Sequence, residues 1–210
     1  MPCLSFNNYS TSDDTMKEES GDRSNPIWLV VNPKYPVVRH NIWTPILDSI
    51  QDNIYRKLCT RIDTGKIFIM NAVSNIGILP NTFDGWEAGV AEEIVTFRES
   101  VLEHQPKILI TFGIVSYEFV KRVTEIRPEV GPKYWRNTDI ANEFERSIAN
   151  FDINKTNRIP LLRRVMKNGK YIAERNYYGL EDGENYFRDV GAKIAARIIE
   201  NKDHLKIWIK

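Results

Sequence analysis

Three positions whose residue types could hold a small molecule follow directly after short apolar runs: Asn32, Asn71 and Gly113. Such runs predict buried β-strands, and in an open parallel sheet ligands gather outside the carboxyl ends of the strands. A carboxamide offers two N–H donors and an acceptor oxygen without charge, which suits recognition of the edge of a neutral heterocycle. The alternative is that each asparagine caps a following turn or helix.

The elements that would position these residues alternate along the chain. Short apolar runs predict strands at residues 27–31, 67–70, 108–112, 158–166 and, as a last edge strand, 205–209. Apolar residues at helical spacing predict helices at residues 42–58, 86–104, 115–123, 140–148 and 184–200. Alternation of strands and helices is typical of a parallel sheet with helices on both faces. The predicted fold class is therefore α/β, a three-layer α/β/α architecture with a mainly parallel central sheet.

Charge divides the chain into two parts. The 210 residues include 29 basic and 28 acidic side chains, which gives a formal net charge of +1. Residues 1–26 hold five acidic and two basic residues and little apolar surface, which predicts a flexible acidic N-terminal tail. Residues 27–210 then form a single domain that carries 27 basic and 23 acidic residues, a net charge of +4.

The strongest local charge lies between residues 155 and 175, where Glu174 is the one acidic residue. The seven basic residues of this segment are Lys155, Arg158, Arg163, Arg164, Lys167, Lys170 and Arg175. Such a patch would bind phosphate groups in a salt-dependent way that is blind to base sequence. A run of charge is also typical of an ordinary solvated surface. We expect the segment to contact DNA, with the solvated surface as the alternative.

Several classes of protein are excluded or disfavoured by the residues that are scarce. Two cysteines, Cys3 and Cys59, are too few for a disulfide framework or a four-thiolate metal site, and the three histidines lie far apart. No apolar stretch approaches the roughly 18 residues of a membrane span. No secretory signal pattern opens the chain, so we expect a cytoplasmic protein. We therefore expect no metal, no cofactor and no membrane partner.

The order and spacing of several short motifs provide a more specific indication. These motifs are Val30–Pro33 (VVNP), His40–Trp43 (HNIW), Ile67–Val73 (IFIMNAV), Gly85–Glu87 (GWE) and Pro106–Gly113 (PKILITFG). Together they resemble the uracil-DNA glycosylase superfamily, in particular the branches with Asn before Pro, which include the mismatch-specific and single-strand-selective glycosylases. The resemblance covers residues 28–123 well and residues 158–199 loosely. It implies a uracil-DNA-glycosylase-like α/β domain.

The resemblance also implies a role for each matching residue. Asn32 would hold or polarise the water that attacks the sugar C1′, and Asn71 would bind the Watson–Crick edge of a flipped-out base. Tyr35 or Trp43 would stack on that base, and Gly113 would line its pocket. The implied protein is a monofunctional DNA glycosylase of base-excision repair, a monomer that needs no cofactor. Flipping gives such enzymes access to a base inside single-stranded or mispaired DNA.

One motif of that superfamily is missing. A late His-Pro-Ser normally stabilises the departing base, but residues 159–170 contain neither His nor Ser. Arg163 or Arg164 could stabilise the developing negative charge instead, or both could simply contact phosphate or solvent. The leading hypothesis is hydrolysis of the N-glycosidic bond of uracil or another deaminated base. The alternatives are a catalytically weak or inactive glycosylase fold that binds nucleic acid or a nucleobase, and an enzyme that acts on a free nucleoside or nucleotide.

Overall fold

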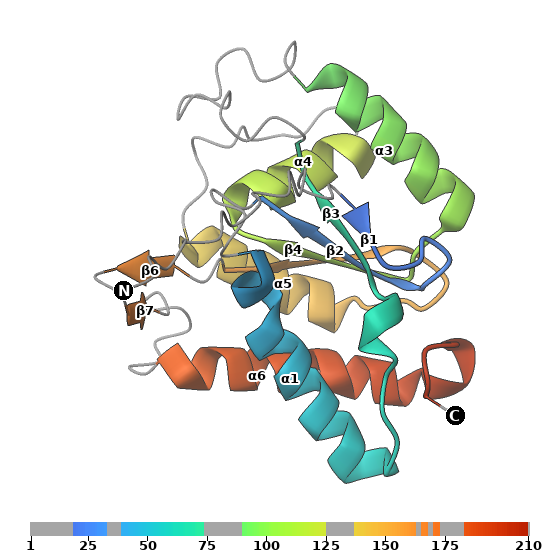
Figure 1. The fold of residues 1–210 in the computed structure, drawn as a ribbon, viewed down its shortest axis with the longest axis vertical. Helices are drawn as coiled ribbons and strands as arrows, with labels where there is room; N and C mark the ends of the chain where they lie inside the picture. Colours follow the sequence, from blue (N-terminus) through green and yellow to red (C-terminus); the bar gives the residue numbers. More distant parts are fainter. Residues whose placement is uncertain are drawn as a thin grey trace, which may run out of the picture.

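The computed structural model describes residues 19–32, 39–73, 90–124, 137–162, 165–167, 170–172 and 183–209. Their main feature is a five-stranded sheet with the strand order β1-β3-β2-β4-β5 (Figure 1). The strands are β1 (Glu19–Ser20), β2 (Ile27–Val31), β3 (Phe68–Asn71), β4 (Ile108–Phe112) and β5 (Asn157–Leu161). The last four are parallel, and β1 is antiparallel to β3. The predicted α/β class with a mainly parallel sheet is confirmed.

Helices cover both faces of this sheet (Figure 1). The helices on one face are α1 (Arg39–Leu58), α5 (Asn137–Ala149) and α6 (Gly183–Glu200). The helices on the other face are α3 (Ala91–His104) and α4 (Ile114–Thr124). Two short 3-10 helices, η2 (Thr64–Lys66) and η4 (Lys202–His204), lie in the connections. None of the described helices is both long and apolar enough to cross a membrane.

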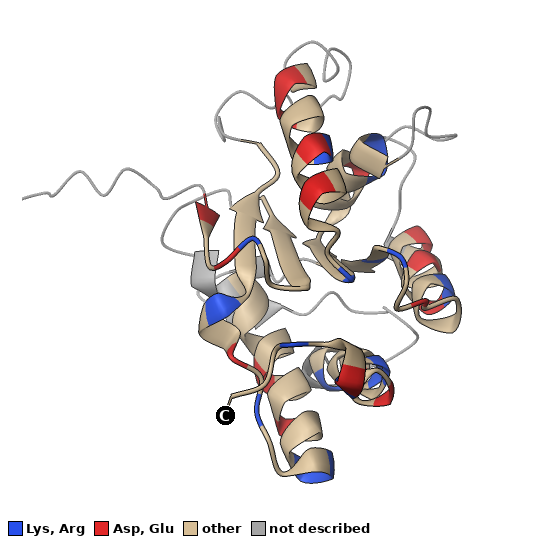
Figure 2. Ribbon diagram, turned by 90° about the vertical axis from the view of Figure 1, so that its right-hand side faces the viewer, with Lys and Arg blue, Asp and Glu red and all other residues tan. Residues whose placement is uncertain are grey.

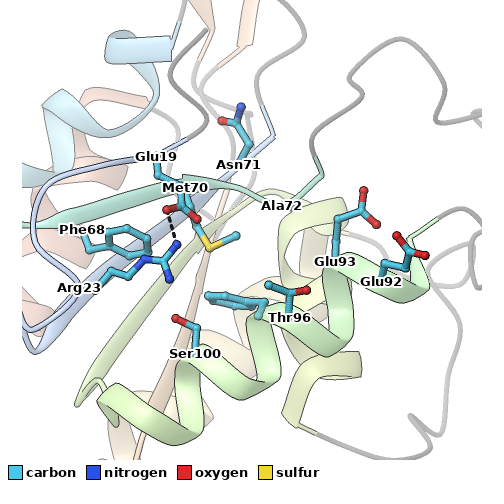
Figure 3. A pocket seen from close by; sticks show the side chains of 11 residues that line it. Glu19, Arg23, Phe68, Met70, Asn71, Ala72, Glu92, Glu93, Thr96 and Ser100 are labelled. Carbon is cyan, nitrogen blue, oxygen red and sulfur yellow. Dashed lines mark hydrogen bonds and ion pairs between the residues drawn. The ribbon is translucent and has the colours of Figure 1, made fainter.

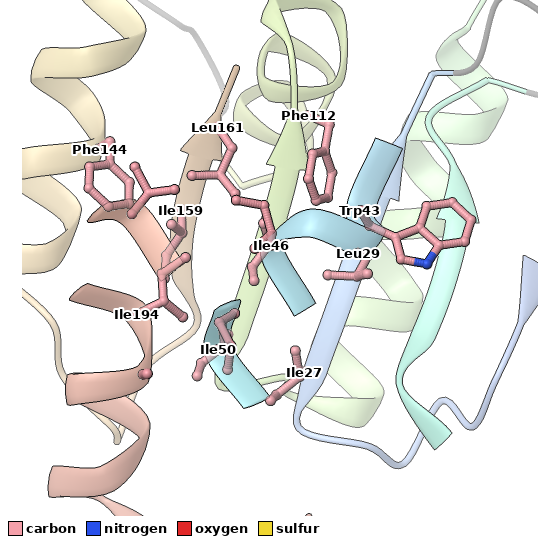
Figure 4. Packing of buried hydrophobic residues seen from close by; sticks show 14 of the residues in the cluster. Ile27, Leu29, Trp43, Ile46, Ile50, Phe112, Phe144, Ile159, Leu161 and Ile194 are labelled. Carbon is pink, nitrogen blue, oxygen red and sulfur yellow. The ribbon is translucent and has the colours of Figure 1, made fainter. Parts of the chain in front are cut away.

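The buried strands separate two hydrophobic cores. Along β2, Leu29 and Val31 face α1, whereas Trp28 and Val30 face α3, as the period of two along a strand requires. Figure 4 shows the first core, in which α1, α6 and the strands meet. Burial on both faces explains why these strands are continuous apolar runs rather than alternating ones.

The folded region begins earlier than the sequence predicts. The two residues of β1 pair with Ile69 and Met70 of β3, so the boundary predicted after residue 26 is wrong. The buried Trp28 ring needs an acceptor for its N–H, and Nε1 donates to the Arg23 carbonyl oxygen at 3.1 Å. Gly21, directly after β1, has φ of +87°, a conformation that allows the chain to turn there. Residues 1–18 of the predicted tail lie outside the described residues.

Two late elements also differ from the prediction. The strand expected at 158–166 is divided, because β5 ends at Leu161 and a separate hairpin follows. In that hairpin β6 (Val165–Lys167) pairs antiparallel with β7 (Lys170–Ile172). The edge strand expected at 205–209 is reduced to one antiparallel bridge between Ile62 and Trp208. The helix expected from residue 86 begins at Ala91, and residues 86–89 are not described.

Candidate functional site

The carboxyl ends of adjacent strands bring the three sequence-selected positions to one edge of the sheet. Asn71 is the last residue of β3 and lies opposite Val31 of β2, so Asn32 follows immediately beyond this pair. The Ala72 N–H donates to the Val31 carbonyl oxygen at 2.7 Å and joins the two strand ends. Gly113 follows β4, which pairs with the other side of β2. We call this the carboxyl edge.

The two asparagines of the carboxyl edge carry buried polar atoms without partners. Asn71 is only 5% exposed, and within the described residues neither its Nδ2 nor its Oδ1 makes a hydrogen bond. The Oδ1 atom of Asn32 is buried and equally unpartnered. Leaving a buried polar group unsatisfied costs about 1–3 kcal/mol. A capping role would require hydrogen bonds from these atoms, so the observed geometry favours a site for an external partner.

The carboxamide of Asn71 lies on the α1 face of the sheet. Its register partner Val31 and its neighbour Ile69 both belong to the core beneath α1, whereas Phe68 and Met70 belong to the core beneath α3. Figure 3 shows the Asn71 side chain pointing away from those two residues. Asn32 stands just past the end of β2, where the chain leaves the sheet.

Two further predicted base-binding residues are fixed by the fold. Trp43 is 7% exposed and packs with Leu29 and Ile46 in the core beneath α1 (Figure 4). The structure therefore gives Trp43 a packing position, and the role of an open stacking surface stays an expectation from the resemblance. Gly113 has φ of +87°, and its N–H donates to the Leu161 carbonyl oxygen at 2.7 Å.

Other predicted site residues cannot be placed with their side chains. Tyr35, Arg163, Arg164 and Arg175 lie outside the described residues. Lys167 and Lys170 are described only as backbone, where they face each other in the β6–β7 hairpin. The last described residue before the two arginines is Leu162, whose N–H donates to the Tyr186 hydroxyl at 2.9 Å. That bond fixes the end of β5 at the carboxyl edge.

Lys155 and Arg158 do not lie beside the carboxyl edge, as their place in the basic segment predicted. They lie at the start of β5, where Asn157 pairs with Ile108 at the start of β4. A five-residue strand is about 16 Å long, so these two residues lie at the opposite edge from Asn32 and Asn71. Lys155 forms an ion pair with Asp152 at 3.3 Å, and Arg158 donates to Thr124 Oγ1 at 2.8 Å. The basic residues belong to one segment of the sequence, but β5 runs through that segment from one end of the sheet to the other. Lys155 and Arg158 therefore lie at the end opposite to the carboxyl edge.

The structure contains a cavity on the α3 face that the sequence did not indicate. It has a volume of about 360 Å³ and lies between β1, β3 and α3 (Figure 3). Its walls come from three segments that are far apart in the sequence, so no local sequence motif contains the residues that form them. The signals that could have found it are the unexplained Ser100 on the buried side of α3 and the Glu92–Glu93 pair that begins the helix.

The described residues contain no group of three or more His, Cys, Asp or Glu side chains that could hold a metal ion. Comparison of the chain with protein-family models, with curated proteins and with solved structures finds no match. The resemblance to the uracil-DNA glycosylases therefore rests on the order and spacing of the sequence motifs alone. The site itself is defined by the geometry of the carboxyl edge.

Proposed function

We propose that the carboxyl edge binds a nucleobase and that the protein hydrolyses the N-glycosidic bond of uracil or another deaminated base in DNA. The observation that carries this proposal is the buried carboxamide of Asn71, which has no hydrogen-bond partner in the described part of the chain. Uracil presents an N–H donor beside a carbonyl acceptor, and a carboxamide offers the complementary acceptor and donor. Two hydrogen bonds from a base would satisfy both atoms of Asn71 at once.

Asn32 would orient the attacking water. Its unpartnered Oδ1 can accept a hydrogen bond from that water and aim the oxygen at C1′ of the deoxyribose. As the new O–C1′ bond forms, the C1′–N bond breaks and its electron pair leaves with the base. The proton released by the water then completes the free base. Positioning of this kind contributes to rate by reducing the entropy lost at the transition state.

The negative charge that develops on the departing base needs a stabilising group. Arg163 and Arg164 follow Leu162 in sequence, directly after the end of β5. A guanidinium at the carboxyl edge would stabilise that charge in place of the histidine of the missing motif. The β6–β7 hairpin with Lys167 and Lys170 would then contribute to contact with the phosphate backbone.

A second candidate function is binding of a nucleobase or nucleic acid without hydrolysis. The observation that favours it is the chemistry of the two edge residues, because a carboxamide cannot accept a proton as a general base. Under this reading Asn71 would still recognise a base, and Asn32 would contact the ligand instead of activating water.

The experiment uses oligonucleotides that contain uracil or hypoxanthine, single-stranded and mispaired, followed by alkaline cleavage of abasic sites. The hydrolytic function predicts abasic product with the unaltered chain, and loss of nearly all of it in Asn71→Ala. Asn154→Ala is the matched control, because Asn154 is an exposed asparagine that bonds only within its own turn. Binding without product would support the second function, and neither binding nor product would refute both.

A further inference from the structure

The cavity on the α3 face has the size and construction of a small-molecule site. Its volume of about 360 Å³ lies within the ordinary range of ligand pockets, roughly 300–1,000 Å³. Phe68 and Met70 of β3 and Phe97 of α3 form its apolar walls (Figure 3). Asn71 and Ala72 also line the cavity where β3 ends, so it adjoins the site proposed at the carboxyl edge. The Asn71 side chain points away from Phe68 and Met70 (Figure 3), so the two sites differ in their remaining walls.

The aromatic walls of the cavity are held rigidly. The Trp28 ring lies 4.7 Å from the Phe68 ring and 5.8 Å from the Phe97 ring between centroids. Both phenylalanines are buried, and Phe97 also stacks on Phe119 with centroids 5.6 Å apart. A ring that enters the cavity would therefore meet a preformed aromatic surface.

The polar rim of the cavity is negatively charged. Among the described residues, the carboxylates of Glu19, Glu92 and Glu93 surround it together with one cation, Arg23. Arg23 pairs with Glu19 and lies over the Phe68 ring, 5.5 Å from its centroid. Within the described residues Glu92 and Glu93 have no ion-pair partner. Figure 2 shows several acidic residues along α3, at the top of the view.

Ser100 supplies a polar group inside the cavity. It is 9% exposed, and its Oγ is buried without a hydrogen-bond partner in the described structure. Helical serines commonly donate to a carbonyl oxygen of the preceding turn, as Ser147 does to Phe144 at 2.8 Å. Ser100 makes no such bond and lines the cavity instead. A buried hydroxyl in this state is typical of a contact that a ligand completes.

We propose that this cavity binds a small aromatic cation, an aryl ring that carries an ammonium or amidinium group. The ring packs against Phe68 and Phe97, and the cation faces the carboxylates of Glu92 and Glu93. Ser100 lies seven residues beyond Glu93, about 10 Å along α3, and its O–H donates to the face of the bound ring at the other end of the cavity. The guanidinium of Arg23 lies 5.5 Å from the centroid of the Phe68 ring, so a cation is already present beside this aromatic wall.

The test is calorimetric titration of the full chain at pH 7 with three probes of one shape: benzylamine, benzyl alcohol and benzoate. We expect saturable binding of benzylammonium, about tenfold tighter than benzyl alcohol, and weaker binding of benzoate. Glu92→Gln combined with Glu93→Gln should remove most of this preference while binding of the alcohol remains. Ser100→Ala should weaken benzylammonium and benzyl alcohol equally, by about threefold. Ser147→Ala is the control and should change nothing.

Three results would overturn the proposal. One is absence of saturable benzylammonium binding, another is equal affinity for the amine and the alcohol, and the third is a Ser100→Leu variant that binds unchanged. Because Ser100 Oγ has no hydrogen bond to lose, Ser100→Ala should fold normally. Circular dichroism of every variant verifies this. None of these outcomes bears on oligonucleotide cleavage at the carboxyl edge, so the two proposals fail separately.

Discussion

Buried asparagine side chains stand at both edges of the sheet, and their hydrogen bonds differ. Asn157, at the amino end of β5, donates from Nδ2 to the carbonyl oxygens of Lys107 at 2.9 Å and Asp152 at 2.8 Å. Its Oδ1 accepts the Asp152 N–H at 2.9 Å. Asn71 makes none of these bonds. Asn157 therefore stabilises the fold, whereas Asn71 remains available to a ligand.

This difference predicts opposite effects of the same substitution. Asn157→Ala should lower the free energy of unfolding by about 2–4 kcal/mol, because it leaves several buried backbone groups unpaired. Asn71→Ala should leave the free energy of unfolding unchanged or raise it by about 1–3 kcal/mol, since it removes buried polar atoms that have no partner among the described residues. Urea unfolding of both variants measures this. Equal losses of stability would contradict the assignment of Asn71 to ligand binding.

At the residue scale, the sequence predicted the location of the carboxyl edge but not the state of its atoms. The rule that polar residues follow buried strands located Asn32 and Asn71, and the strand register places them on neighbouring strands. No sequence pattern could reveal that their polar atoms are unpartnered. The burial of Trp43 was also hidden, because a helical tryptophan beside a loop is equally compatible with stacking and with packing.

At the scale of elements, α1 and α6 pack closely against each other. Gly191 of α6 lies against Ser49 of α1, so a Cβ atom at Gly191 would come within 2.5 Å of the Ser49 Cβ. Ser49 Oγ also donates to the Arg188 carbonyl oxygen at 3.4 Å. Of the two alanines one turn further along α6, Ala195 is buried and Ala196 is exposed.

Gly191→Ala should therefore destabilise the protein although alanine is the better helix former. We expect a loss of about 1–3 kcal/mol from overpacking. Adding Ser49→Gly removes the opposing Cβ and should restore part of this loss, so the two substitutions are not additive. Thermal unfolding of the two single variants and the double variant measures the coupling. Additive losses would show that α1 and α6 do not meet at this point.

The element boundaries that sequence reasoning missed share a physical cause. The two-residue strand β1 is too short to show a period, and it forms because β3 and Trp28 offer it partners. Likewise, Leu205 to Ile209 form only one bridge, so the apolar pattern there reflects packing of Leu205 and Ile207. The long amphipathic helices were predictable, because many residues contribute to each pattern.

At the scale of the whole molecule, the distribution of charge predicts which basic residues affect DNA binding. Lys155→Ala and Arg158→Ala should leave the affinity for single-stranded DNA nearly unchanged, because both lie at the amino ends of the strands. Lys167→Ala combined with Lys170→Ala should reduce the slope of log affinity for single-stranded DNA against log salt by about 1.4. Fluorescence anisotropy across a salt series measures both. The reverse order of effects would contradict a DNA-facing carboxyl edge.

Stability of the whole fold should also depend on acid in a defined direction. The backbone N–H of Ser24 lowers the pKa of Asp22 below its usual 3.8, and the backbone N–H of Asn154 does the same for Asp152. A lowered folded-state pKa stabilises the fold above about pH 4, and this is lost as the pH falls through the folded-state value. Asp22→Asn with Asp152→Asn should flatten the fall in Tm between pH 4 and pH 2, measured by calorimetry. An unchanged dependence of Tm on pH in the double variant would contradict this role of the two aspartates.

The central claim is that the Asn71 carboxamide at the carboxyl edge contacts a nucleobase. The most direct measurement is NMR of the ¹⁵N-labelled full chain during titration with a single-stranded oligonucleotide that contains one uracil. The Asn71 side-chain amide signals, assigned by their loss in Asn71→Ala, should shift saturably, while those of Asn154 stay in place. Thymine in place of uracil should give a smaller shift. Saturable binding of the oligonucleotide with unmoved Asn71 signals, or no binding at all, would contradict the claim.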